Sequence, residues 1–102
     1  MAKRYLQQKE YRILHTNWTC HWGEIDIVAV KDNQITFFEV KTRKKEVLET
    51  ISHGKLKRLF RSAQIYLKKY GYGFSQFQVD FIGITTEDGR LIHFENVLEV
   101  RL

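Results

Sequence analysis

Proline is absent from the 102-residue sequence, and cysteine occurs once. A single cysteine, Cys20, excludes an internal disulfide and is typical of a protein in a reducing compartment. No apolar run approaches the ~18 residues of a membrane-spanning helix, and residues 1–12 lack the apolar core of a secretory signal. We therefore expect a soluble, cytoplasmic protein. The absence of repeats and of low-complexity or proline-rich linkers predicts one domain over residues 1–102.

Positive charge is unevenly distributed along the chain. The formal net charge is +5, and ten of the 17 Lys and Arg residues lie in residues 41–69, which contain two acidic residues. Clustered basic side chains gain affinity for nucleic acid by releasing condensed counterions from phosphates. Nothing in the sequence is suited to reading base edges, so we expect backbone-dominated, structure-selective binding.

Hydrophobic periodicity divides the chain into seven elements. Apolar residues recur at 3.6-residue spacing from 55 to 70, which predicts a helix with Gly71 as its C-cap and Ser52 as a candidate N-cap. Alternating and continuous apolar runs predict strands, and the turn residues of 31–34 predict an antiparallel hairpin. The expected elements are a helix over 2–9, strands over 11–18, 24–30 and 35–42, the helix over 55–70, and strands over 76–84 and 91–100. This α-β-β-β-α-β-β order predicts an α/β fold with a central mixed β-sheet flanked by helices.

Two of the predicted strands carry charged residues among apolar ones. "GEIDIVAV" (23–30) contains Glu24 and Asp26, and "FFEVKTR" (37–43) contains Glu39 and Lys41. Residues two apart in a strand share a face, and hairpin pairing brings Asp26 near Glu39. Neighbouring carboxylates repel one another, whereas a divalent cation such as Mg²⁺ prefers such oxygen ligands. These strands therefore predict a metal site at Asp26 and Glu39, with Lys41 placed to activate a water.

A longer pattern resembles a known family. The segments are "AKRYL" (2–6), "ILHTNW" (13–18), "GEIDIVA" (23–29), "FFEVKTR" (37–43), Lys55 and "VDFI" (79–82). Together they resemble the small bacterial YraN-like family of the PD-(D/E)xK, restriction-endonuclease-like superfamily, which is related to archaeal Holliday-junction resolvases. The resemblance implies a restriction-endonuclease-like fold, cleavage of DNA with Mg²⁺ or Mn²⁺, and a homodimer that spans two strands. It also implies that Asp26 and Glu39 are metal ligands, Lys41 is the catalytic lysine and Glu24 is the accompanying acid.

The resembling proteins usually have a longer first helix with a Gly-x-x-Gly-Glu-type segment, whose glutamate completes the metal shell. This sequence starts after that point, so we expect that acid to be absent. A non-catalytic nucleic-acid-binding module of the same fold is therefore the alternative hypothesis. A third hypothesis is a scaffold protein whose basic helix binds an acidic partner.

Several side chains have two interpretations. Glu24 is either a metal ligand or a solvated neighbour, and Lys55 is either a phosphate contact or a surface lysine. Trp18 and Trp22 either stack on exposed bases or, as we favour, pack in the fold. Asp80 interrupts an apolar strand and is best explained as a buried acid satisfied by a neighbouring strand or by Arg43. The expected phosphate contacts are Arg43, Lys44, Lys45, Lys55, Lys57, Arg58 and Arg61.

Overall fold

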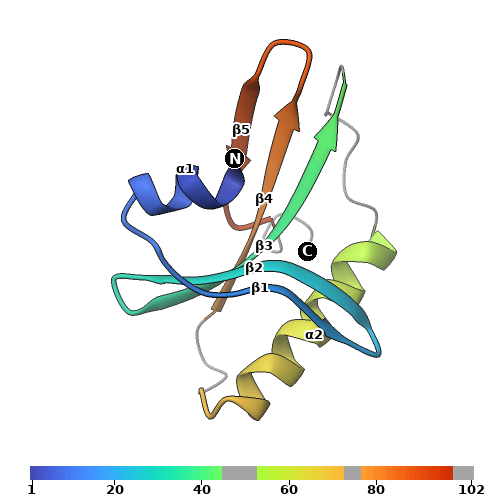
Figure 1. The fold of residues 1–102 in the computed structure, drawn as a ribbon. Helices are drawn as coiled ribbons and strands as arrows, with labels where there is room; N and C mark the ends of the chain where they lie inside the picture. Colours follow the sequence, from blue (N-terminus) through green and yellow to red (C-terminus); the bar gives the residue numbers. More distant parts are fainter. Residues whose placement is uncertain (45–52, 73–76, 98–102) are drawn as a thin grey trace.

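The computed structural model describes residues 1–44, 53–72 and 77–97, which form two helices and a five-stranded sheet (Figure 1). The α-β-β-β-α-β-β order and the mixed α/β class are as predicted and are compatible with a restriction-endonuclease-like fold. Neither helix in these ranges is long and apolar enough to cross a membrane. The elements are α1 (Ala2–Gln8), β1 (Arg12–Cys20), β2 (Gly23–Lys31), β3 (Gln34–Arg43), α2 (His53–Lys69), β4 (Phe77–Thr85) and β5 (Arg90–Phe94).

The strands are arranged in the order β1-β2-β3-β4-β5, so each one pairs with its neighbours in sequence. β3 and β4 are parallel and the other pairs are antiparallel. A parallel pair needs a long crossover connection, and α2 lies in the connection between β3 and β4. Figure 1 shows that β1 and β2 cross β3 and β4 at a wide angle.

The hairpin between β2 and β3 fixes the register of the two charged strands. Asp32 and Asn33 have φ of 53° and 63°, the left-handed conformation that both central residues of a tight type I′ turn need. Lys31 therefore pairs with Gln34, and the ladder continues to Ile27 and Phe38. The predicted hairpin is confirmed.

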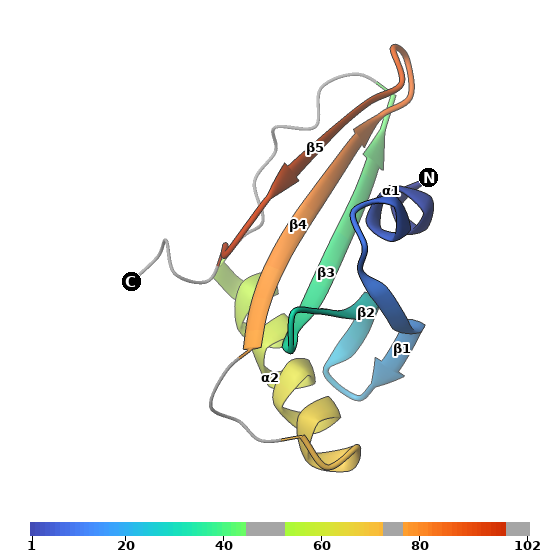
Figure 2. The same ribbon diagram turned by 90° about the vertical axis from the view of Figure 1, so that its left-hand side faces the viewer.

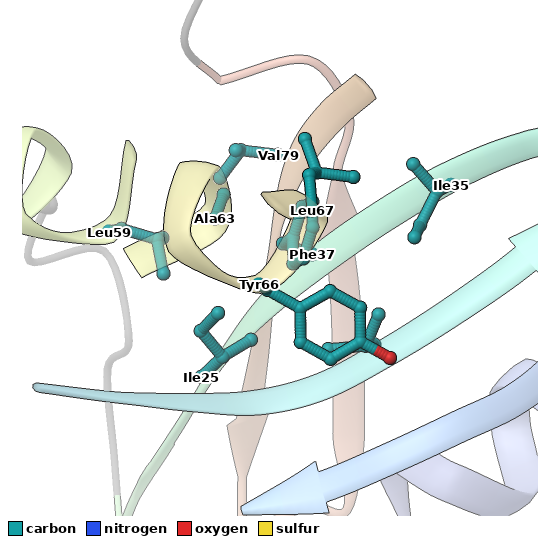
Figure 3. Close-up of a cluster of buried hydrophobic side chains, with 9 residues drawn as sticks. Ile25, Ile35, Phe37, Leu59, Ala63, Tyr66, Leu67 and Val79 are labelled. Carbon is teal, nitrogen blue, oxygen red and sulfur yellow. The ribbon is translucent and has the colours of Figure 1, made fainter. Parts of the chain in front are cut away.

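The two helices cover opposite faces of the sheet. α2 contributes Leu59, Ala63, Tyr66 and Leu67 to a core with side chains from β2, β3 and β4, including Phe37 (Figure 3). α1 places Leu6 in a second core on the other face, with Ile27, Ala29, Phe38 and Ile82. Figure 2 shows the two helices well apart, with α1 beside the arrowhead half of β3 and α2 near the start of that strand. Burying each large apolar side chain contributes roughly 1.5–3 kcal/mol to stability.

The ends of two elements test the sequence predictions. Gly71 ends α2 with φ of 78°, and the Tyr72 amide donates to the Leu67 carbonyl over 2.9 Å, which is a Schellman cap as predicted. The predicted strand over 91–100 is wrong for residues 95–97, which follow the end of β5 at Phe94. Asn96 has φ of 55° and turns its amide toward Asp80, which ends the pairing of β5. Ser52 and residues 98–100 lie outside the described residues.

Candidate functional site

A cleft of about 260 Å³ lies between α2 and the diverging ends of β2 and β3. Three of the predicted acidic residues, Glu24, Asp26 and Glu39, line it. The opposite wall comes from α2, where Lys55 and Arg58 face the acids. The complete lining is Trp22, Gly23, Glu24, Asp26, Glu39, Lys55, Arg58, Leu59 and Ser62.

Asp26 lies at the point where β2 and β3 separate. The described ladder ends at the pair Ile27–Phe38, so Asp26 and Glu39 occupy the next position in register. Instead of a backbone partner, the Val40 amide donates to Oδ2 of Asp26 over 2.7 Å. The carboxylate thus replaces a ladder hydrogen bond and holds the two strands at the mouth of the cleft.

The alternation of side chains along β2 does not hold around Asp26. Ile25 and Val28 both face the α2 core, whereas Ile27 and Ala29 face the α1 core. Asp26 borders the cleft and also a shallow hollow on the α1 face. The partner strand is distorted too, since Asn17 has φ of 51° between the paired residues Thr16 and Trp18. Simple alternation predicted that the Asp26 side chain lies on one face of the sheet. Instead, it lies between the two faces.

Glu39 is a buried carboxylate with a lysine partner from the opposite wall. It is 7% exposed, and Nζ of Lys55 lies 2.8 Å from its Oε2. The hydrogen bond from Lys55 to Glu39 raises the pKa of Lys55 above its ordinary value, although partial burial acts in the opposite direction. Lys55 therefore lies in the cleft as the ion-pair partner of Glu39, and its phosphate contact stays a prediction.

Lys41 lies beside this ion pair, on the same side of β3 as Glu39. The hydrogen bond with Lys55 and the positive charge of Lys55 hold the pKa of Lys41 below its ordinary value. Partial burial and Arg43 lower it further, whereas Glu39 opposes the shift. Neutral amine, the form that accepts a proton, is thus more accessible at Lys41 than at an isolated lysine.

The donor set suits a hard divalent cation. Asp26 uses Oδ2 for the Val40 amide, and within the described ranges Oδ1 accepts no hydrogen bond. Mg²⁺ typically binds one or two carboxylates and completes its octahedral shell with waters and substrate phosphates. Within those ranges no three His, Cys, Asp or Glu side chains converge to hold an ion by themselves. The donor chemistry of Asp26 and Glu39 therefore fits a magnesium ion, and exposed Glu24 lines the same cleft.

The predicted phosphate contacts divide into two groups. Lys55 and Arg58 line the cleft, and the Arg61 guanidinium lies 5.0 Å from the centre of the Trp22 ring. Arg61 and the other described contacts lie outside the lining and are exposed: Lys57 on α2, Arg43 at the end of β3 and Lys44 directly after it. Lys45 lies outside the described residues.

The tryptophans have different surroundings. Trp18 packs edge-on against Tyr66, with ring centres 5.2 Å apart, and its indole N–H donates to the Tyr70 hydroxyl over 3.3 Å. The packing interpretation is confirmed for Trp18. Trp22 lies in the turn between β1 and β2 and borders the cleft under Arg61, so its wall position leaves the base-stacking interpretation open.

Asp80 belongs to a separate buried network on the α1 face. It is fully buried, and its carboxylate lies 2.7 Å from Nε2 of His93 on β5. Oδ1 accepts from the Gln78 amide and the Asn96 backbone N–H, and Nδ1 of His93 lies 2.8 Å from the Tyr5 hydroxyl. The predicted satisfied acid is thus confirmed with a neighbouring-strand partner. That partner is His93, not Arg43, in the network described here.

Sequence reasoning missed the pairing of Lys55 with Glu39. A signal for it was present in the helix, because residues 55, 58, 59 and 62 share one face at i, i+3, i+4 and i+7. Three of these four, Lys55, Arg58 and Ser62, are polar, so the first turns of α2 break the apolar stripe that faces the sheet. Polar residues on the sheet-facing side of a helix indicate a polar site beneath it.

The family model and the individual relatives that match this chain all belong to the same family. The model of uncharacterised protein family UPF0102 matches residues 1–84. A UPF0102 protein of Chloroflexus aurantiacus is 37% identical over 99 residues, covering 95% of this chain and 82% of the relative. A UPF0102 protein of Carboxydothermus hydrogenoformans is 35% identical over 105 residues, covering 97% and 89%. The chain therefore belongs to the UPF0102 family.

Proposed function

We propose that this protein is a Mg²⁺-dependent endonuclease of the PD-(D/E)xK superfamily that hydrolyses phosphodiester bonds in DNA. One observation carries the proposal: the carboxylates of Asp26 and Glu39 border one cleft, and Lys41 and Lys55 lie beside them. The resemblance of "GEID" and "EVK" to the superfamily signature, with the compatible fold, supports the same chemistry. Mn²⁺ would serve as a substitute for Mg²⁺.

Each side chain has a role in this reaction. Asp26 and Glu39 would hold the cation, which when bound would supply a Lewis acid that offsets negative charge on the phosphate. Lys41 orients the attacking water and accepts a proton from it, and the hydrogen bond with Lys55 and neighbouring positive charge lower the pKa of Lys41 in this direction. The water oxygen forms the new bond to phosphorus as the bond to the leaving oxygen breaks, and that oxygen takes a proton from solvent. Lys55 and Arg58 hold the phosphate.

The surroundings of the cleft favour substrates recognised by shape. Its polar wall residues on α2 are basic or hydroxyl-bearing and suit phosphate oxygens rather than base edges. DNA with a branch or a single-stranded segment can place one backbone deep in the cleft, and we propose this as the substrate class. Affinity should fall steeply as salt is raised.

The direct test is nicking of branched and single-stranded DNA with Mg²⁺ or Mn²⁺. We expect the wild-type chain to cleave, and Glu39→Ala and Lys41→Ala to lose cleavage. Glu87→Gln is the matched control, because Glu87 is an exposed acid in the turn between β4 and β5. Equal activity in all four proteins would show that a contaminant cleaves the DNA and would contradict the assignment.

The ion pair between Lys55 and Glu39 favours a second candidate, a non-catalytic nucleic-acid-binding module, because it neutralises Glu39 without a metal. Such a module would bind DNA equally in EDTA and in Mg²⁺ and would never cleave it. A binding assay in the two buffers, run beside the nicking assay, separates the two candidates.

A further inference from the structure

We propose that Lys55 is an exchangeable cation of the site, which neutralises Glu39 in the metal-free protein and moves to a substrate phosphate when a divalent ion binds. This inference rests on the proposed metal site. It adds an order to the reaction, since metal binding would prepare the cleft for nucleic acid.

The contact between Lys55 and Glu39 can open from one side. The Glu39 side chain is 9% exposed and is fixed in the middle of β3. The Lys55 side chain is 35% exposed and lies in the first turns of α2, on a flexible four-carbon stem. Breaking their 2.8 Å contact therefore requires movement of the lysine side chain toward the open cleft, which also breaks its hydrogen bond with Lys41.

The charges show why one cation would displace the other. Lys55 also interacts electrostatically with Asp26, so its ammonium offsets both proposed metal ligands. Each carboxylate is stabilised by a nearby positive charge, and a divalent ion supplies more charge than an ammonium at similar separation. The ion and the ammonium repel each other when both lie against Glu39. Binding of the divalent ion therefore weakens the contact of the ammonium with the carboxylates, and the ammonium weakens binding of the ion.

The released ammonium would remain in the cleft. Arg58 lines the same wall one helical turn after Lys55, so the two form a basic pair facing the acids. A lysine is a good point-charge partner for a phosphate oxygen. Metal binding would thus free the Lys55 ammonium to donate a hydrogen bond to a phosphate oxygen in the cleft. Nucleic acid would therefore bind more weakly to the metal-free protein.

Calorimetric titration of Mg²⁺ into the full chain tests the exchange. Lys55→Met should bind the ion about tenfold more tightly than wild type, a size typical of linked sites. Lys68→Met is the matched control, because Lys68 lies on the same helix about 20 Å away along its axis at 1.5 Å per residue. That separation exceeds the Debye length of ~8 Å at physiological salt, so its affinity should equal that of wild type.

The outcomes separate this inference from the proposed function. If wild type and Lys55→Met bind Mg²⁺ with equal affinity, the metal site stands and the exchange is overturned. If neither binds Mg²⁺, both the metal site and the exchange are overturned. Lys55→Gln, which keeps a hydrogen-bond donor for Glu39 without the charge, takes the place of Lys55→Met if that variant does not fold.

A second readout uses the wild-type protein. NMR signals of the lysine side-chain amines report their hydrogen bonds, so the Lys55 signal should shift as Mg²⁺ saturates the site. The Lys68 signal serves as the internal reference and should stay in place. A Lys55 signal unchanged at saturating Mg²⁺ would show that the ion pair persists, which overturns the exchange.

Discussion

Glu39 on β3 and Asp80 on β4 are both buried carboxylates. Their strands are paired, and the two residues are offset by one position in the register. Asp80 pairs with Phe38, and Glu39 pairs with Phe81. Asp80 has partners on both of its oxygens, from His93, Gln78 and the Asn96 amide. Glu39 instead meets Lys55, a half-exposed lysine at the edge of a cleft. The two acids face opposite sides of one sheet.

We propose that this difference separates a structural acid, Asp80, from an acid that can take a ligand, Glu39. A buried carboxylate with fixed donors on all sides stabilises the fold and has no capacity for a ligand. A buried carboxylate whose partner is a flexible side chain next to open space can exchange that partner. Asp80 links β4 to β5 and, through His93, to α1, whereas Glu39 has a carboxylate oxygen at the cleft that a cation could contact.

The largest expected effect is the loss of DNA cleavage when Glu39 is changed. Glu39→Gln should lower cleavage by about a thousandfold, or ~4 kcal/mol, because the metal loses a charged ligand. Its free energy of unfolding should change by less than about 1 kcal/mol, since the amide oxygen still accepts from Lys55. Nicking rates and urea denaturation measure the two effects. A stable Glu39→Gln protein with wild-type cleavage would contradict the role of Glu39.

The next effect concerns the structural side. Asp80→Ala should lower the free energy of unfolding by about 3 kcal/mol, because it leaves buried donors of His93 and Gln78 without their acceptor. Urea denaturation measures this loss, and Mg²⁺ affinity of the folded fraction should stay unchanged. Asp88→Ala, at an exposed ion pair with Arg90, is the control and should cost less than about 0.5 kcal/mol. Loss of Mg²⁺ binding in folded Asp80→Ala would remove the distinction between the acids.

A smaller effect is expected on DNA affinity when basic residues of α2 are changed. Arg58→Ala should weaken DNA binding about tenfold and reduce the salt dependence by one phosphate contact. Lys57→Ala should weaken it about twofold, because at about 100° per residue Lys57 lies on the opposite side of α2 from Lys55 and is not part of the lining. Binding measured across a salt series distinguishes the two. The reverse order would place the nucleic acid on the outer face of α2.

Local signals in the sequence predicted most of the fold and the placement of Asp26 opposite Glu39 in the candidate site. Asp32 and Asn33 gave a turn, the turn set the register, and the register brought Asp26 opposite Glu39. The helical period of residues 55–70 and the cap at Gly71 depend on neighbours in sequence as well. Each of these predictions needed only short-range rules.

The features that sequence reasoning missed depend on contacts between distant residues. Lys55 reaches Glu39 only because α2 crosses over the point where β2 and β3 separate. The polar face of the first turns of α2 indicates a polar site beneath the helix, but it does not identify Glu39 as the partner. Asp26 leaves its expected face because its carboxylate takes the Val40 amide as partner. β5 stops at Phe94 because the amide of Asn96 turns to Asp80, a residue on the neighbouring strand.

The central claim is that Asp26 and Glu39 share one divalent ion, and calorimetry of Mg²⁺ binding to wild type and Asp26→Asn tests it most directly. Asn keeps the acceptor oxygen for the Val40 amide but lacks the charge, so the fold should persist. We expect wild type to bind one ion per chain and Asp26→Asn to release no heat of binding. Absence of binding in wild type, or equal affinity in Asp26→Asn, would contradict the claim.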